Sequence, residues 1–233
     1  MTAETAAGAG VRNAALARAA CFELVASAFL LIAVVGSGIM AERLSAGNTA
    51  LALLANAIAT GGALLALILA FAPLSGAHMN PVVTAAAALE GELPWRAVPV
   101  YALAQVAGAV LGVVLAHLMF ELPALQLGTH VRTGTGQWLA EAIATLGLLA
   151  TIWGARAHGI PATAAAVAAY IAGAYWFTAS TSFANPAVTL ARALTDTFAG
   201  IRPADAPGFI LAQLAGLALA LPLLRAMRQN QGR

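Results

Sequence analysis

Six long apolar stretches constrain the fold of this chain more than any other feature of its sequence. Each is close to the roughly 20 residues that an α-helix needs to cross the hydrocarbon core of a membrane. The pattern therefore predicts an all-α membrane protein with six transmembrane helices. The expected helices lie at residues 21–40, 50–71, 98–120, 138–154, 161–177 and 207–224.

Composition excludes most other classes of protein. Of the 233 residues, 61% are hydrophobic and 9% are charged, whereas soluble domains carry about 25% charged residues. So few charges cannot cover a globular surface, which excludes a cytosolic enzyme, a disordered protein and a soluble binding module. The net charge of +2 gives no basic footprint for nucleic acid. The single cysteine, Cys21, excludes an internal disulfide and a cysteine-based metal site.

The N-terminal region admits a second interpretation as a signal peptide, because Arg12 and Arg18 precede the first apolar stretch. That stretch continues to about residue 40, too far for the apolar region of a signal peptide, so we interpret it as the first span. Six spans put both termini on one side of the membrane. A cytoplasmic location is favoured for that side, because it leaves seven arginines inside and four outside. The outer four are Arg43, Arg132, Arg192 and Arg202.

Two short apolar segments, each too short to span a membrane, are near copies of each other. Residues 80–89 read NPVVTAAAAL and residues 185–194 read NPAVTLARAL, and seven of the ten positions match. Other matching residues occur in the same order in both halves of the chain. They are Glu23 and Glu141 before the short segments, and Gln105 and Gln213 after them.

These matches predict a single domain, residues 1–233, built from two repeats at about residues 21–120 and 138–224. Each repeat contains three spans, so the second copy must lie upside down in the membrane. Inverted repeats of this kind recur in transport proteins, with the transport site near the middle of the membrane.

Each short segment can form only half of a transmembrane helix. Asn80 and Asn185 are good N-caps, and Pro81 and Pro186 suit the first helical position. About ten residues at 1.5 Å each give roughly 15 Å, half the thickness of the hydrocarbon core. The inverted symmetry is expected to bring the two asparagines together at mid-membrane.

Two helix N-termini that face each other penalise a cation, including a hydrated proton, because each acts as roughly half a positive charge. The side-chain N–H groups of Asn80 and Asn185 are expected to donate to a passing hydroxyl. The site is therefore predicted to favour small, neutral, hydroxyl-bearing solutes. The alternative is that both Asn-Pro pairs merely cap buried helices. A single Asn-Pro pair would fit that interpretation better than two pairs in inverted repeats do.

At these residues the chain resembles the aquaporin, or major intrinsic protein, family. The resemblance covers nearly the whole chain and includes SGAHMNPV at residues 75–82 and the triplet Asn185-Pro186-Ala187. Val82 stands where the family usually has Ala, at a position that turns away from the solute path. The resemblance implies the aquaporin fold, with six spans and two half-helices, and a homotetramer with one pore per subunit. It implies no cofactor and no bound metal ion.

The resemblance also implies an outer selectivity filter formed by Thr60, Gly173, Ser182 and Val188. Water-selective members of the resembled family have Phe, His, a small residue and Arg at these four positions. Glycerol facilitators have Trp, Gly, Phe and Arg. With Val188 in the Arg position, the filter is expected to be wide, uncharged and partly apolar. Arg192 lies one helical turn beyond Val188. It either projects into the outer vestibule or is tied to Asp196 or to another subunit.

A filter with Val at the Arg position resembles a bacterial branch of the family associated with arsenic resistance. The resemblance implies passage of arsenite, which is a neutral trihydroxide near neutral pH, and of methylated arsenicals. Glycerol and water are expected to pass as well, in the bacterial inner membrane. The alternatives are a glycerol, polyol or water channel without an arsenic role, and a proton-coupled transporter.

The intramembrane polar residues each admit two roles. Glu23 and Glu141 either carry protons or hold the non-helical backbone before each half-helix. The structural role is favoured, because the two are symmetric and no Lys or Asp relay accompanies them. His78 either lines the pore or is a hydrogen-bonded structural residue. Gln105 and Gln213 are expected to bond between helices.

Two further classes are an intramembrane enzyme and a non-conducting junction protein. No nucleophile with a base, and no cluster of metal ligands, occurs at motif spacing, which argues against the enzyme. Residues 121–136 form a loop expected outside the membrane, where it covers the pore mouth or contacts a neighbouring subunit. The basic tail after Arg225 is expected to meet anionic membrane lipid.

Overall fold

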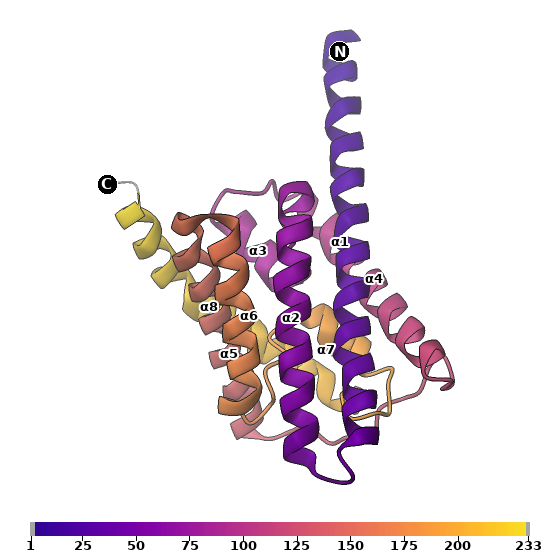
Figure 1. Ribbon diagram of the computed structural model, residues 1–233. Coiled ribbons are helices and arrows are strands. Elements are labelled where there is room, and N and C mark those ends of the chain that lie inside the picture. Colours follow the sequence, from indigo (N-terminus) through magenta and orange to yellow (C-terminus); the bar gives the residue numbers. More distant parts are fainter. Residues whose placement is uncertain (1–2, 232–233) are drawn as a thin grey trace.

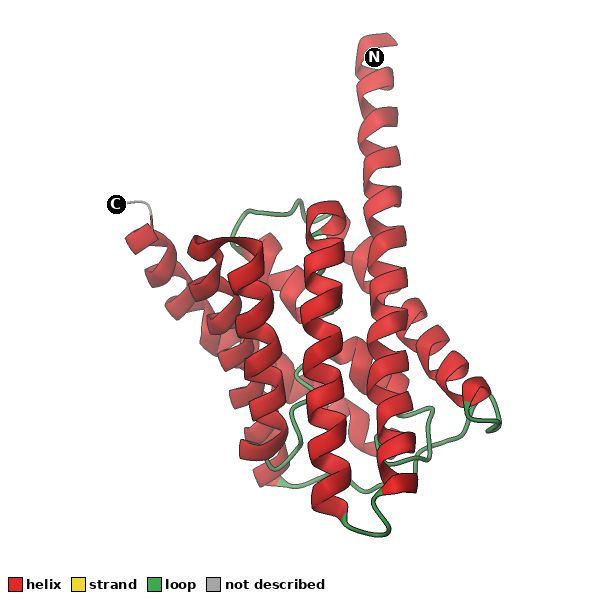
Figure 2. Cartoon of the chain, viewed as in Figure 1, coloured by secondary structure: helices red, strands yellow, loops and turns green. Residues whose placement is uncertain are grey.

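The computed structural model describes residues 3–231, and the side chains of residues 13–228. Within this range the chain is made of helices and loops, with no strand (Figure 2). The prediction of an all-α fold is thus confirmed. In chain order the elements are α1 (Ala3–Leu44), α2 (Thr49–Ser75), α3 (Pro81–Leu89), α4 (Ala97–Met119), α5 (Thr135–Ala155), the 3-10 turn η1 (Arg156–His158), α6 (Gly159–Phe177), α7 (Pro186–Arg192), the 3-10 turn η2 (Pro203–Asp205) and α8 (Ala206–Gln231).

The long helices are apolar enough to cross a membrane. Five continuous helical stretches in the described chain meet that criterion, and one of them, Thr135–Phe177, holds both α5 and α6. Because α5 and α6 reverse direction at η1 and lie side by side, the bundle has six crossings (Figure 1). Figure 1 also shows both termini at the same end of the bundle, as six crossings require.

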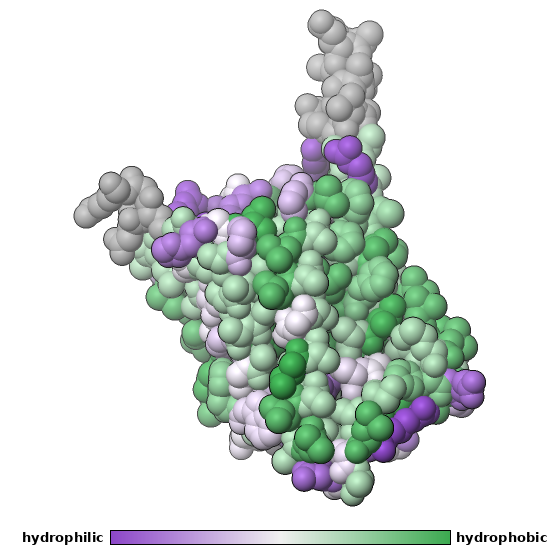
Figure 3. All heavy atoms as spheres, viewed as in Figure 1, coloured by the Kyte–Doolittle hydropathy of each residue, from purple (hydrophilic) through white to green (hydrophobic). Residues whose placement is uncertain are grey.

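The surface matches a membrane environment. On the face shown in Figure 3, apolar residues form a broad middle band, and polar residues gather at the two ends. Large apolar side chains on the spanning helices, such as Leu103 in α4 and Leu211 in α8, are mostly exposed. Such exposure would be costly in water and is favourable against lipid tails.

The two halves of the chain pack in the same way. Helix α1 packs against α2 and α4, and its counterpart α5 packs against α6 and α8. The halves join where α2 meets α6 and where the short helices α3 and α7 meet. The two halves therefore pack in matching ways, and the contacts between them include those of the short helices.

Matching glycines lie at close helix contacts in each half. A Cβ added at Gly108 in α4 would overlap the carbonyl oxygen of Leu24, and one added at Gly216 in α8 would overlap that of Ala142. Leu24 and Ala142 directly follow Glu23 and Glu141. The glycines therefore allow the helix that carries each glutamate, α1 or α5, to pack closely against the helix that carries the matching glutamine, α4 or α8. Small residues commonly allow such close packing in membranes.

Replacing Gly108 by Ala is expected to lower the free energy of unfolding by about 2 kcal/mol, because α1 and α4 must separate. Gly62→Ala is the matched control, since Gly62 lies within α2 with nothing near its missing Cβ. Thermal unfolding of the purified protein in detergent measures both. Equal melting temperatures for the two variants would contradict this account of the packing.

Candidate solute pore

Each short helix begins at an asparagine that caps it. The Oδ1 atom of Asn80 accepts a hydrogen bond from the backbone N–H of Val82 at 3.0 Å, and that of Asn185 accepts from Ala187 at 3.0 Å. Pro81 and Pro186 occupy the first helical positions, where no backbone donor is needed. Both short segments are therefore half-helices that start deep inside the bundle, as the sequence predicted.

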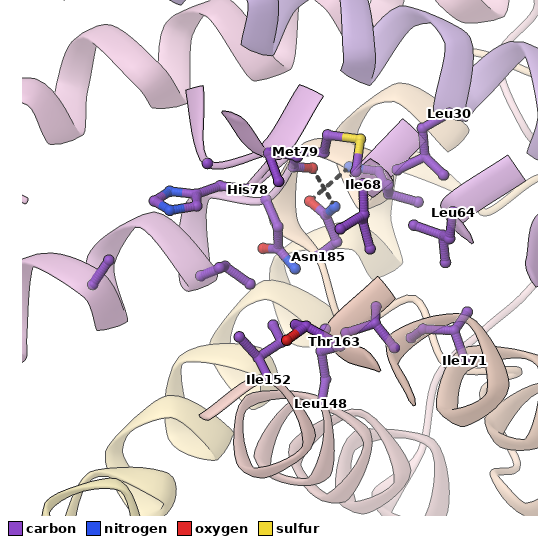
Figure 4. Close-up of a pocket in the computed structure, with 18 of the residues that line it drawn as sticks. Leu30, Leu64, Ile68, His78, Met79, Leu148, Ile152, Thr163, Ile171 and Asn185 are labelled. Carbon is purple, nitrogen blue, oxygen red and sulfur yellow. Dashed lines mark hydrogen bonds between the residues drawn. The ribbon is translucent and has the colours of Figure 1, made fainter. Parts of the chain in front are cut away.

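The asparagines also join the two repeats to each other. The Nδ2 group of Asn80 donates to the carbonyl of Ala184 at 2.8 Å, and that of Asn185 donates to the carbonyl of Met79 at 2.7 Å. Figure 4 shows the contact between Asn185 and Met79. One N–H of each amide is thus used within the protein. Since an amide has two, the second is left for a solute.

The backbone before each half-helix adopts matching left-handed conformations. Met79 and Ala184, directly before the asparagines, have φ of 49° and 48°, and Ala77 and Ser182 have φ of 49° and 53°. Such conformations cost non-glycine residues about 1–2 kcal/mol each. They hold the chain in a non-helical form in the middle of the membrane, which is tolerated only where polar partners are supplied.

Glu23 and its counterpart Glu141 supply those partners. Glu23 accepts from the backbone N–H of His78 at 2.9 Å and from that of Met79 at 2.7 Å. Glu141 accepts from Phe183 and from Ala184, both at 2.8 Å. Both glutamates are completely buried, and neither is among the described residues that line the pore cavity. Their geometry supports the structural role over the proton-carrying one.

Gln105 and Gln213 complete the two networks. The Nε2 group of Gln105 donates to Glu23 at 2.7 Å, and that of Gln213 donates to Glu141 at 2.7 Å. Each also bonds a threonine hydroxyl on a half-helix, and the four donor–acceptor pairs link different helices. The predicted bonding of these glutamines between helices is present in both halves.

A cavity of about 500 Å³ runs past the paired asparagines. One wall is apolar and includes Leu64, Ile68 and Leu148, as Figure 4 shows. The polar groups come from the two non-helical segments. Ala77 and Ser182 line the cavity, and in the described structure their carbonyls accept no hydrogen bond from protein. The cavity lining therefore combines apolar side chains with the asparagine amides and with two residues whose carbonyls accept no hydrogen bond in the described chain.

His78 lies on this cavity and is also tied to the protein. Its Nδ1 atom lies 3.1 Å from the hydroxyl of Thr84, and its ring packs against that of Tyr101. Both predicted roles, pore lining and structural bonding, are thus met in one side chain. Val82 is buried and is not among the described cavity-lining residues, as the resemblance implied.

Three of the four predicted filter residues line the cavity, namely Thr60, Ser182 and Val188. Gly173 does not, and the expectation is corrected here. The cavity-facing side of α6 carries Ile171 and Tyr175, whereas a Cβ on Gly173 would point at Phe177. The hydroxyl of Tyr175 lies 3.2 Å from that of Thr60 and closes this side of the filter.

Counting residues back from Asn185 placed the filter position at Gly173, whereas the neighbouring residues of α6 that line the cavity are Ile171 and Tyr175. The helical period of the apolar residues in α6 would have indicated Tyr175, because Val167 and Ile171 precede it at four-residue steps on the same face.

A charged side chain lies beside the predicted filter, whose four residues carry no charge themselves. Arg192 lines the cavity, its Nε group donates to the carbonyl of Ala199, and its guanidinium lies 3.4 Å from the centre of the Phe183 ring. The predicted alternative of a tie to Asp196 is wrong, because that carboxylate accepts from Thr129 instead. Arg192 therefore places a positive charge beside the pore, one helical turn beyond Val188.

A second arginine, Arg132, extends from the loop at residues 121–136 toward the same Phe183 ring. It donates through Nε to the carbonyl of Gly200 at 2.8 Å, and its guanidinium lies 5.2 Å from the centre of the Phe183 ring. The loop itself bonds to the chain after α7, with Gly128 N–H donating to Ala193 at 3.1 Å. The loop therefore packs against the segment that follows α7.

The fold and the site define a class of protein: a membrane channel built from two inverted repeats whose half-helices meet at a narrow passage. Comparison with known proteins identifies the family. Residues 10–159 match the family described as Major intrinsic protein. The chain belongs to that family, and it is accordingly a channel and not an enzyme.

Individual relatives agree with this assignment. The chain is 54% identical over 215 residues to aquaglyceroporin AqpS of Rhizobium meliloti (strain 1021), covering 92% of this chain and 91% of the relative. It is 40% identical over 98 residues to aquaporin NIP1-4 of Oryza sativa, covering 42% and 34% of the two chains. The solved aquaglyceroporin of Plasmodium falciparum superposes with a TM-score of 0.70 at 20% identity, covering 90% of this chain and 94% of the other, and shows the shared fold.

Glu23→Gln is expected to lower the free energy of unfolding by about 2 kcal/mol, because a neutral amide has one acceptor oxygen for two backbone donors. Glu121→Gln is the control, since Glu121 is exposed in the loop after α4. Melting temperatures in detergent measure the effect. A Glu23→Gln protein as stable as the control would contradict the role assigned to this carboxylate.

Proposed function

We propose that this protein is a passive channel of the aquaglyceroporin type for small neutral solutes. Arsenite and related hydroxylated metalloids, including methylated arsenicals, are the leading solutes, and glycerol and water also pass. The observation that carries the proposal is Val188 at a filter position where water and glycerol channels of the resembled family have Arg.

The lining of the cavity supports solutes of this shape. Arsenite and glycerol both present several hydroxyl groups, which need donors and acceptors along one side of the path. The amides of Asn80 and Asn185 and the carbonyls of Ala77 and Ser182 offer them, while the opposite wall offers apolar contact. Hydrogen bonds to these groups replace the hydrogen bonds that the solute makes to water. A neutral solute can therefore pass without a large desolvation cost.

Charge at the passage supports the exclusion of cations. The half-helix N-termini meet at mid-membrane, and Arg192 adds a full positive charge beside the filter. A solute that carries no charge meets neither barrier. The alternative of a polyol or water channel without an arsenic role shares all of these features and differs only in which solute passes fastest.

The assembly and location form part of the proposal. The family resemblance and the exposed apolar helices support a homotetramer, with one pore per subunit, surrounded by membrane lipid. The relative from Rhizobium meliloti supports a bacterial inner membrane. The arginine distribution supports cytoplasmic termini.

Val188→Arg is expected to slow arsenite and glycerol by about tenfold or more, because a long cationic side chain narrows the filter. Water flux should change much less. Flux into proteoliposomes, followed by light scattering for glycerol and water and by elemental analysis for arsenic, measures this. Val188→Ala, which keeps a small apolar residue, is the matched control and should retain wild-type selectivity.

Two results would overturn parts of this proposal. If wild-type vesicles pass glycerol and water but exclude arsenite, the polyol alternative is correct. If only water passes, the filter is narrower than Val188 and Thr60 suggest, and Tyr175 with Arg192 must close it.

A further inference from the structure

We propose that the vestibule above the filter holds a binding site for a small oxyanion, formed by Arg132 and Arg192. The vestibule is a second cavity of about 390 Å³, at the end of the bundle away from the termini. Both arginines line it, with Thr181 and His130 beside them. Arg192 also lines the pore cavity, so the site lies directly over the entrance to the filter.

Neither guanidinium has a carboxylate partner. In the described part of the chain, no Asp or Glu side chain lies within ion-pair distance of Arg132 or Arg192. Arg192 is only 2% exposed, and its sole protein acceptor in this range is the carbonyl of Ala199. A buried guanidinium without a carboxylate in direct contact is costly, so Arg192 at this depth favours an anionic ligand.

The two arginines are held close to each other by a shared aromatic ring. Both guanidinium carbons lie over Phe183, so their separation cannot exceed the sum of the two ring distances. Two like charges within this limit repel each other, and an anion that contacts both guanidinium groups offsets the repulsion. Phe183 is itself fixed, because its backbone N–H donates to Glu141 and its ring packs on Phe209.

The acidic groups nearby are committed elsewhere. Asp196 accepts from Thr129 and lies 4.0 Å from His130. Asp205 is paired with Arg202 at 2.7 Å and also accepts the backbone N–H of Arg132 at 2.8 Å. The buried Glu141 accepts from the backbone N–H groups of Phe183 and Ala184. Glu42 lines the vestibule but is exposed and pairs with neither arginine. The net character of the inner wall of the vestibule is therefore cationic.

The chemistry of the guanidinium selects the ligand class. Its planar set of donors matches two oxygens of one anion, so phosphate-like or carboxylate-like oxyanions suit the site better than a halide does. Bound at this position, an oxyanion covers the entrance beside Arg192. Occupancy is therefore expected to slow the entry of neutral solutes from that side.

The test uses inorganic phosphate as the probe, with purified full-length protein at constant ionic strength. The melting temperature of the wild type is expected to rise with phosphate along a saturable curve. Arg132→Gln should need about tenfold more phosphate for the same rise, and Arg132→Lys should fall between the two. Arg43→Gln is the matched control, because Arg43 is an exposed arginine that bonds the carbonyl of Phe120 and should leave the curve unchanged.

A second measurement covers the case in which the arginine variants fold poorly. Phenylglyoxal modifies arginine side chains, and peptide mass spectrometry of the wild type reports each site. Phosphate should protect Arg132 and leave Arg43 as reactive as before. An equal rise in melting temperature for all variants, or equal protection of both arginines, would show a general salt effect and overturn the site. Both readouts are independent of which solute the channel conducts.

Discussion

The structure depends on a reciprocal pair of hydrogen bonds at its centre, in which each capping asparagine donates to a carbonyl of the opposite repeat. Asn80 reaches Ala184 and Asn185 reaches Met79. These carbonyls are available because the residues that bear them are held in left-handed conformations. The strained backbone is in turn held by Glu23 and Glu141, which accept its N–H groups away from any water.

Solute selection follows from that arrangement. Two half-helices that begin at the same depth direct the positive ends of their dipoles at the passage, which disfavours cations. The same non-helical segments leave carbonyl acceptors along one wall, opposite apolar side chains such as Ile68 and Leu148. A neutral solute with several hydroxyl groups satisfies both walls. The elements that stabilise the fold at mid-membrane are thus the ones that define which solutes it can pass.

Much of this arrangement could be predicted from the sequence, because it rests on local and repeated signals. Asn-Pro marks a helix start, and its recurrence with matching Glu and Gln residues indicates the inverted repeat. The predicted half-helix at 185–194 ends earlier in the structure, at Arg192. Its last two residues instead leave their carbonyls to accept from Gly128 and Gln126 of the long loop. No local sequence pattern predicts that pairing.

The predictions about the filter that differ from the structure have the same cause. Tyr175 replaces Gly173 on the pore because the orientation of α6 depends on its packing and not on a count from Asn185. Arg132 lies 60 residues from Arg192 in the chain, and only the folded loop brings both over Phe183. The sequence already offered Arg192 as a vestibule residue one turn beyond Val188, whereas Arg132 comes from a loop without a motif and reaches the second cavity only in the folded chain.

We propose that the buried glutamates are structural and that solute crosses without a proton. A direct measurement follows internal pH and solute entry together, in vesicles that contain a pH-sensitive dye and the reconstituted channel. A glycerol gradient is expected to dissipate rapidly while internal pH follows that of empty vesicles. Proton entry that rises in proportion to solute flux, and that disappears in Glu23→Gln or Glu141→Gln, would contradict it.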